Sequence, residues 1–210
     1  MTAYFGAWRA LPRGQRWLLI LLGLAVAIAN VGQPYPDVAP LHHVPTALLV
    51  LAGPLMLRRW PLSTGSLGAL VAFFLLHTLA GRYTYSNVPY DAWAIALTGQ
   101  DVTGSFGLER NGFDRLVHLG FGLLWTLPFA EIVQRHGGLG RAASLWMAFL
   151  FVGAGSAAYE VFEWLLTMVV APGMAESYNG QQGDMWDAQK DMALAMGGSL
   201  AACLWPRKRR

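Results

Sequence analysis

Residues 111–133 read NGFDRLVHLGFGLLWTLPFAEIV, a polar stretch that runs without a break into an apolar one. The apolar part, 116–133, is close to the roughly 20 residues that a helix needs to cross a bilayer. In the polar part, Asn111, Asp114, Arg115 and His118 are spaced i, i+3, i+4 and i+7, so in a helix they share one face. The stretch therefore predicts a transmembrane helix with a polar entrance.

Five further apolar runs are candidate spans, at 17–31, 43–57, 62–80, 142–170 and 192–205. Three of them are short, but each becomes a span if its helix extends a turn into polar flanking sequence. An alternative for the first run is a cleaved signal peptide, because it contains Ala27-Ile28-Ala29 after a basic segment. The pattern predicts an all-α fold, a polytopic bundle of six transmembrane helices that forms a single integral membrane domain over residues 1–210.

The composition agrees with a membrane protein. Charged residues make up 13% of the chain, against about 25% in soluble domains. Nine tryptophans and seven tyrosines suit a chain with two membrane interfaces. The net charge of +3 comes from short basic clusters beside apolar runs, which argues against nucleic acid as a partner. The lipid bilayer is the expected partner.

The basic residues also indicate an orientation. They cluster before the first run, between the second and third, between the fourth and fifth, and after the sixth. Because such segments stay in the cytoplasm, we expect both termini to be cytoplasmic. The outer segment between the third and fourth runs still contains Arg82, Arg110 and Arg115, together with several acids. We expect these arginines to be paired or to bind a ligand.

Polar residues from distant parts of the chain should meet near the outer end of this bundle. His77 lies near the outer end of the third run, and His118 lies one turn into the fourth. Glu160 and Glu163 are one turn apart in the outer half of the fifth run. The sixth run begins with aspartates at 184, 187 and 191, again on one face. Because acids inside a membrane are costly, a functional site is the first hypothesis.

The candidate residues fall into three groups. Acid–base catalysis is expected from Asp114, His118, Glu160 and Glu163. Binding of an anionic substrate is expected from Arg82, Tyr85, Arg110, Asn111 and Arg115. A divalent metal ion is the candidate cofactor, with ligands drawn from His118, Glu163, Asp184, Asp187 and Asp191. Among these ligands, Glu163, His118 and Asp187 form the preferred trio.

Each group also has a purely structural alternative. Arginine–carboxylate pairs can lock a bundle together, histidines can be hydrogen-bonded core residues, and acids favour helix starts. Glu131 and Arg135, spaced i, i+4 at the inner end of the fourth run, are interpreted as a structural pair. His42 and His43 are assigned no role.

Four motifs resemble the YjdF family of bacterial inner-membrane proteins. They are RYTYS at 82–86, RNGFDRLVH at 110–118, EVFEW at 160–164 and QGDMWDAQKDM at 182–192. The resemblance implies a multi-pass protein of the bacterial inner membrane and names no reaction. Residues 113–121 and 187–198 are more loosely similar to two helices of VanZ-like proteins, which implies a role in the cell envelope.

Three functions fit these residues. The first is an enzyme whose outer site, with or without a metal ion, acts on an anionic lipid or an envelope precursor. The second is a proton- or ion-coupled transporter or channel, which needs acids that continue past the middle of the membrane. The third is a non-catalytic envelope scaffold whose charges only hold the helices together.

Overall fold

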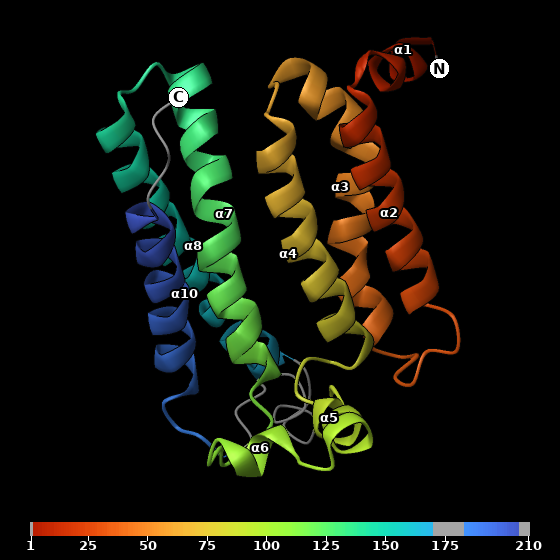
Figure 1. Cartoon of the computed structure of the whole chain (residues 1–210), viewed down its shortest axis with the longest axis vertical. Helices are drawn as coiled ribbons and strands as arrows, with labels where there is room; N and C mark the ends of the chain where they lie inside the picture. The colour runs from red at the N-terminus through yellow and green to blue at the C-terminus, as the bar shows by residue number, and fades with distance from the viewer. Residues whose placement is uncertain (1, 170–182, 206–210) are drawn as a thin grey trace.

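The structure is a computed structural model that describes residues 2–169 and 183–205, and these residues form helices joined by loops (Figure 1). The all-α prediction is confirmed. The long helices are α2 (Arg13–Ala29), α3 (Ala39–Arg59), α4 (Thr64–Arg82), α7 (Phe113–Gly137), α8 (Arg141–Val169) and α10 (Asp187–Leu204). Three shorter helices are α1 (Thr2–Ala10), α5 (Tyr90–Thr98) and α6 (Val102–Ser105). Residues 170–182 and the basic C-terminal residues 206–210 lie outside the described residues.

The described helices confirm a membrane bundle. Four segments are long and apolar enough to cross a bilayer: α3, α4, α7 and the Arg141–Leu165 part of α8. The pair α1 and α2, bent by 115°, makes a fifth if it is counted as one span. Helix α10 has 18 residues, and three of its first five are charged. The count of six spans therefore stays a prediction.

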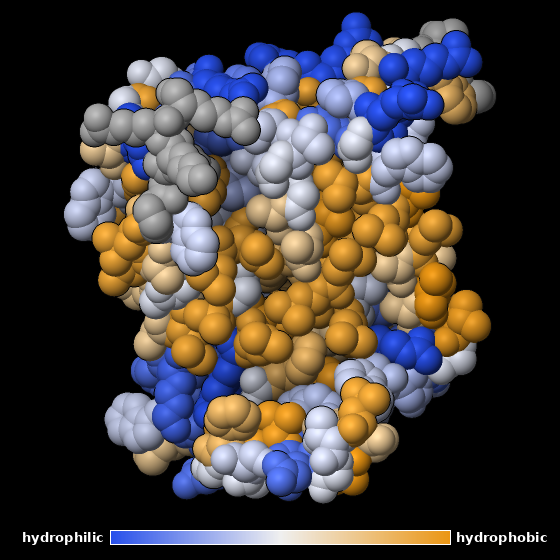
Figure 2. Space-filling model, viewed as in Figure 1, coloured by the Kyte–Doolittle hydropathy of each residue, from blue (hydrophilic) through white to orange (hydrophobic). Residues whose placement is uncertain are grey.

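The long helices lie side by side, with α1 at one end and α5 and α6 across the other (Figure 1). Hydrophobic side chains form a belt around the middle of the face in view, and hydrophilic ones gather at both ends (Figure 2). Near the end that carries α5 and α6, a strongly hydrophilic patch interrupts the belt over the start of α10 and α7. The arrangement therefore leads to a polar site at that end.

Helices α7 and α10 touch backbone to backbone. A Cβ atom on Gly122 would lie only 2.0 Å from the carbonyl oxygen of Ala195, and one on Gly198 only 2.5 Å from that of Leu119. One turn further inward, the hydroxyls of Thr126 and Ser199 are hydrogen-bonded at 2.7 Å. Small residues of this kind permit close helix approach in membranes. They fix how α10 lies along α7.

The opposite end of the bundle is held by Glu131. Its carboxylate accepts hydrogen bonds from the backbone N–H of Ser63, at 2.7 Å, and from the hydroxyls of Ser63 and Ser66 at the start of α4. Arg135 Nε donates to the same carboxylate at 2.8 Å. The interpretation of Glu131 and Arg135 as a structural pair is confirmed.

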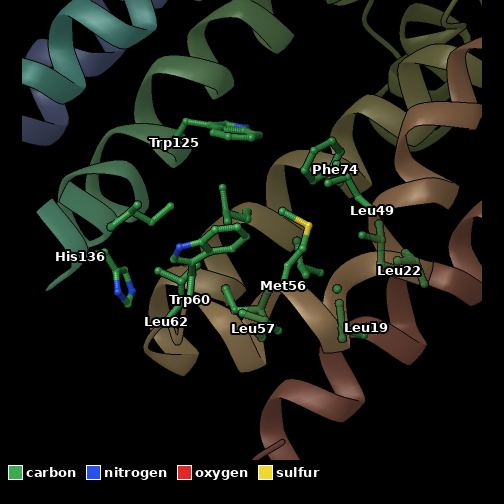
Figure 3. A pocket seen from close by; sticks show the side chains of 16 residues that line it. Leu19, Leu22, Leu49, Met56, Leu57, Trp60, Leu62, Phe74, Trp125 and His136 are labelled. Atoms are coloured by element: carbon green, nitrogen blue, oxygen red, sulfur yellow. The ribbon is translucent and has the colours of Figure 1, made fainter. Parts of the chain in front are cut away.

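A cavity of about 340 Å³ lies between the halves of α2, α3, α4 and α7 that are nearer to α1 (Figure 3). Its labelled side chains are apolar except for His136 and the indole nitrogens of Trp60 and Trp125. Such a lining suits hydrocarbon chains and offers little to an anionic group. The polar site therefore lies elsewhere.

Adjacent glycines in α10 test the helix contact. We expect Gly198→Ala to cost about 2 kcal/mol, because the new methyl group meets the backbone of α7 and neither helix can move aside alone. Gly197→Ala is the matched control: its Cβ meets nothing within 4 Å, so stability should hold or rise slightly. Thermal unfolding of the detergent-solubilised variants measures the difference. Equal melting temperatures would refute the contact.

Reporter fusions test the orientation and the span count. Alkaline phosphatase, which is active only outside the cytoplasm, should be active when inserted at Gly99 between α5 and α6. The same enzyme fused after the C-terminus should be inactive, because six spans return the chain to the cytoplasm. Activity at the C-terminus would contradict the six-span topology.

Candidate functional site

The entrance to α7 is built by Asn111 and Tyr90. Asn111 Oδ1 accepts a hydrogen bond from the backbone N–H of Phe113 at 3.1 Å, and its amide group donates to the carbonyl of Val88 at 2.8 Å. The Tyr90 hydroxyl accepts from the backbone N–H of Gly112 at 3.1 Å. These bonds satisfy donors at the helix start that have no partner within the helix. Asn111 thus joins the outer loop to α7 and holds the following residues in place.

Ion pairs form an outer layer of charge at this entrance. The Arg110 guanidinium donates to Asp114 at 2.7 Å and also binds Asp187. Arg115 lies 2.5 Å from Asp184 and 3.5 Å from Asp187. We call these residues, together with Lys190, the rim cluster. The side chains of Arg110 and Asp187 are each only 5% exposed, so this pair is a buried one.

The rim cluster is electrically balanced. Its sixth member, Lys190, donates to Asp184 at 2.5 Å. Lys190, the backbone N–H of Trp186 and Arg115 lower the pKa of Asp184 to about 2. Burial alone would lower the pKa of Arg110, but its two aspartate partners raise it overall. Three cations therefore face three carboxylates, and no charge in this layer is left over.

A second group lies deeper, one residue from each of α7, α8 and α10. His118 Nε2 is 3.5 Å from Glu160 Oε1 and 3.7 Å from Asp191 Oδ2. We call His118, Glu160 and Asp191 the inner acid cluster. His118 Nδ1 is hydrogen-bonded to the Ser156 hydroxyl at 3.3 Å. Among the described residues, Glu160 Oε1 and Asp191 Oδ1 are buried without a hydrogen-bond partner.

Glu163 belongs instead to a hydrogen-bonded chain of side chains. It is bonded to Tyr159, which is bonded to Tyr85. The Tyr85 hydroxyl lies 2.5 Å from His77 Nδ1, and His77 Nε2 is 3.0 Å from the carbonyl oxygen of His42. Burial and the nearby Glu163 carboxylate raise the pKa of Tyr85, so its hydroxyl keeps its proton.

Counting donors along this chain assigns its protons. His77 Nε2 faces a carbonyl oxygen, so it must donate a hydrogen bond to it. In a neutral His77, Nδ1 then carries no proton and accepts a hydrogen bond from the Tyr85 hydroxyl. The Tyr85 hydroxyl oxygen then accepts a hydrogen bond from the Tyr159 hydroxyl. The Tyr159 oxygen in turn accepts one from Glu163, which must be protonated to donate it. An ionised Glu163 reverses the bonds between Glu163 and His77 Nδ1, while His77 Nε2 still donates to the His42 carbonyl, so His77 must then be protonated. The chain therefore carries one proton that belongs to Glu163 or to His77.

Tyr85 reaches this position through an unusual backbone. Thr84 and Tyr85 have φ angles of 50° and 59°, which non-glycine residues rarely adopt. Two successive residues of this kind persist only where surrounding contacts hold them. The contacts of Tyr85 with His77 and Tyr159 are such contacts, and they tie the outer loop to the bundle.

The structure brings most of the candidate residues together, with two differences. Arg82 lies apart from the rim cluster and donates to the carbonyl oxygens of residues 29, 31 and 32, at 2.6, 2.9 and 3.0 Å, at and just after the C-terminal end of α2. The preferred metal trio also differs, because the residues that converge are His118, Glu160 and Asp191. Glu163 faces the tyrosine chain, and Asp187 is bound to Arg110.

Some contributors carry no sequence signal of their own. Tyr159 and Ser156 are ordinary residues of an apolar helix, and only the packing of α8 on α7 shows their contacts. His43 is buried and bonds to Asn30 and to the carbonyl of Thr78, so its role is structural. His42 contributes its backbone oxygen to His77.

Comparison with known proteins identifies the family. Residues 15–210 match the family described as "Predicted membrane protein (DUF2238)". The chain is also 32% identical over 172 residues to the inner membrane protein YjdF of Escherichia coli (strain K12), covering 80% of this chain and 75% of that protein. The chain belongs to the YjdF family. It is a multi-pass protein of the bacterial inner membrane, as the motifs predicted. No solved structure matches it, and these matches add no support for the likeness to VanZ-like proteins.

The buried Arg110–Asp187 pair can be tested by removing one partner. We expect Arg110→Gln to cost about 3–5 kcal/mol, because Asp114 loses its counter-charge and Asp187 loses the nearer of its two arginine partners. The control, Lys190→Gln, should change stability little, because that side chain is 47% exposed. Thermal unfolding in detergent measures both, and the double variant Arg110→Gln/Asp187→Asn should recover part of the loss. An unchanged melting temperature for Arg110→Gln would show that the pair does not form.

Proposed function

We propose that this YjdF-family protein is an envelope enzyme that binds the anionic headgroup of a membrane amphiphile at the non-cytoplasmic end of its bundle. The proposal rests mainly on a cavity of about 350 Å³ beside the rim cluster. Three cations line it, Arg110, Arg115 and Lys190, together with Asp184, Glu109 and short loop residues. Its volume is within the usual range for a ligand pocket.

The two arginines have more donors than their aspartate partners use. Among the described residues, the Nε atoms of Arg110 and Arg115 are buried and have no hydrogen-bond partner. A guanidinium offers five N–H donors, so each arginine can bind an aspartate and an anionic ligand together. Phosphate and carboxylate oxygens are the partners that this geometry prefers. The cavity thus suits a phospholipid headgroup or a phosphorylated lipid precursor.

Groups able to move protons lie behind the rim cluster that lines this cavity. Asp114 is bound to Arg110, and His118 lies one turn further along α7, facing Glu160. Glu163 shares a proton with His77 through the two tyrosines. A carboxylate and an imidazole held near a bound headgroup can act as general base and acid. A divalent cation held by the same acids would add charge stabilisation to the reaction.

The arrangement favours an enzyme over the other two functions. A transport path needs acids that continue inward, and in the described inner half Glu131 is already bound by Ser63, Ser66 and Arg135. A scaffold needs only paired charges, whereas the inner acid cluster keeps two buried oxygens without hydrogen-bond partners among the described residues. Both features support chemistry at the outer end.

Headgroup binding can be measured by thermal shift of the purified, metal-stripped protein. We expect short-chain phosphatidylglycerol to raise the melting temperature by several degrees, and phosphatidylcholine of the same chain length to have little effect. Arg115→Gln should abolish the shift, because it removes a cation from the cavity wall. Arg135→Gln is the matched control, an arginine of the same helix that pairs with Glu131 at the other end.

Inorganic phosphate, used as a second probe, distinguishes a free phosphorylated ligand from a lipid headgroup. A shift with phosphate alone would indicate a free phosphorylated ligand, and a shift only with phosphatidylglycerol would indicate a lipid headgroup. The same shift in the wild type and in Arg115→Gln, or none with either probe, would overturn the proposal.

A further inference from the structure

The inner acid cluster contains two acidic side chains that pair with no lysine or arginine among the described residues. The three carboxylates of the rim cluster are matched by Arg110, Arg115 and Lys190. In the part of the chain that the structure describes, His118 is the only basic side chain within 4 Å of Glu160 or Asp191. Two ionised carboxylates at this depth repel each other and need a cation or a proton.

The distances within the cluster indicate a small shared ion. In a charge-assisted hydrogen bond the nitrogen and oxygen atoms lie about 2.7–2.9 Å apart. Here His118 Nε2 lies 3.5 Å from Glu160 Oε1 and 3.7 Å from Asp191 Oδ2, too far for such bonds. Ligand atoms that surround a metal ion at ~2.1 Å in tetrahedral geometry are about 3.4 Å from one another. The two nitrogen–oxygen distances are close to that spacing, and the three ligand atoms all lie within 4.8 Å of one another.

Unsatisfied oxygen atoms provide the second observation. The Asp191 side chain is only 5% exposed, and its Oδ1 has no hydrogen-bond partner among the described residues. Glu160 Oε1, which faces His118, is also buried without a hydrogen-bond partner among the described residues. Buried carboxylate oxygens are normally bonded, so an unpaired oxygen on each of the two acids that face His118 indicates a missing positive ligand.

We propose that His118, Glu160 and Asp191 together bind one divalent metal ion. Ser156 holds His118 Nδ1 and so leaves Nε2, the nitrogen that faces both acids, available as a ligand. Asp114, Asp187 and Asp191 also lie close together, but Arg110 already binds the first two. The metal therefore belongs to the inner acid cluster and not to the rim.

The ligand set also selects the ion. One imidazole nitrogen with two carboxylates suits Zn²⁺ or Mn²⁺, whereas Ca²⁺ takes six to eight oxygen ligands. Three protein ligands leave at least one coordination position for water or substrate, which is the pattern of catalytic metal sites. The metal site deepens the proposed enzyme function, but its formation does not depend on the anionic ligand.

Metal binding is measured on the full-length protein, purified in detergent and stripped with a chelator. Isothermal titration with Zn²⁺, and separately with Mn²⁺, should show one equivalent bound. Glu160→Gln and Asp191→Asn should each weaken binding by about tenfold or more, because each removes a charged ligand. Glu131→Gln is the matched control, since that glutamate is bound by serines and Arg135 at the opposite end. Circular dichroism and size exclusion check that the variants fold.

Electron spin echo spectroscopy of bound Mn²⁺ adds a readout that can be taken on the wild-type protein without any variant. Nitrogen coupling from one imidazole is expected, and His118→Gln should remove it. Absence of binding at millimolar metal, absence of nitrogen coupling, or equal affinity in the wild type, Glu160→Gln and Asp191→Asn would each overturn the metal site. Because headgroup binding is measured on stripped protein, it can succeed or fail independently of this result.

Discussion

The close contact between α7 and α10 is the constraint on which the polar site depends. At Gly122 and Gly198 the two backbones meet with no side chain between them, so the helices cannot slide past each other. One turn outward from this contact, His118 of α7 faces Asp191 of α10, and one further turn outward Arg110 and Asp114 meet Asp187. A shift of α10 by one residue would separate all of these pairs at once.

The helix contact stacks two layers of charge with different properties. The outer layer is balanced and rigid, because each of its carboxylates is bound by at least one cation. The inner layer has carboxylates and an imidazole but no fixed cation among the described residues. A balanced rim lowers the cost of burying the site, while the unbalanced interior keeps affinity for an ion or a proton. The cavity at the rim is lined by Arg110, Arg115, Asp184 and Lys190 of the outer layer.

Sequence spacing predicted that the polar residues meet at one end of the bundle, where the structure gathers most of them, but it did not assign their partners. Glu160 and Glu163 are one turn apart, so helical periodicity gives them equivalent positions. The structure separates them, because Glu160 faces His118 and Glu163 meets Tyr159. Arg82 has the charge expected for an anion site, yet it lies at the end of α2 and binds carbonyl oxygens there. Neither outcome is encoded in local spacing.

The amino-acid sequence by itself determined that this protein is a helical membrane bundle and that its polar motifs collect at one end. Both follow from local rules, since hydrophobic length and charge placement decide which segments span a bilayer. Only the tertiary structure decided which acid pairs with which cation, and which acids are left without one. That choice depends on the rotation and register of each helix, which are set by packing between segments far apart in the chain, such as Gly122 against Ala195.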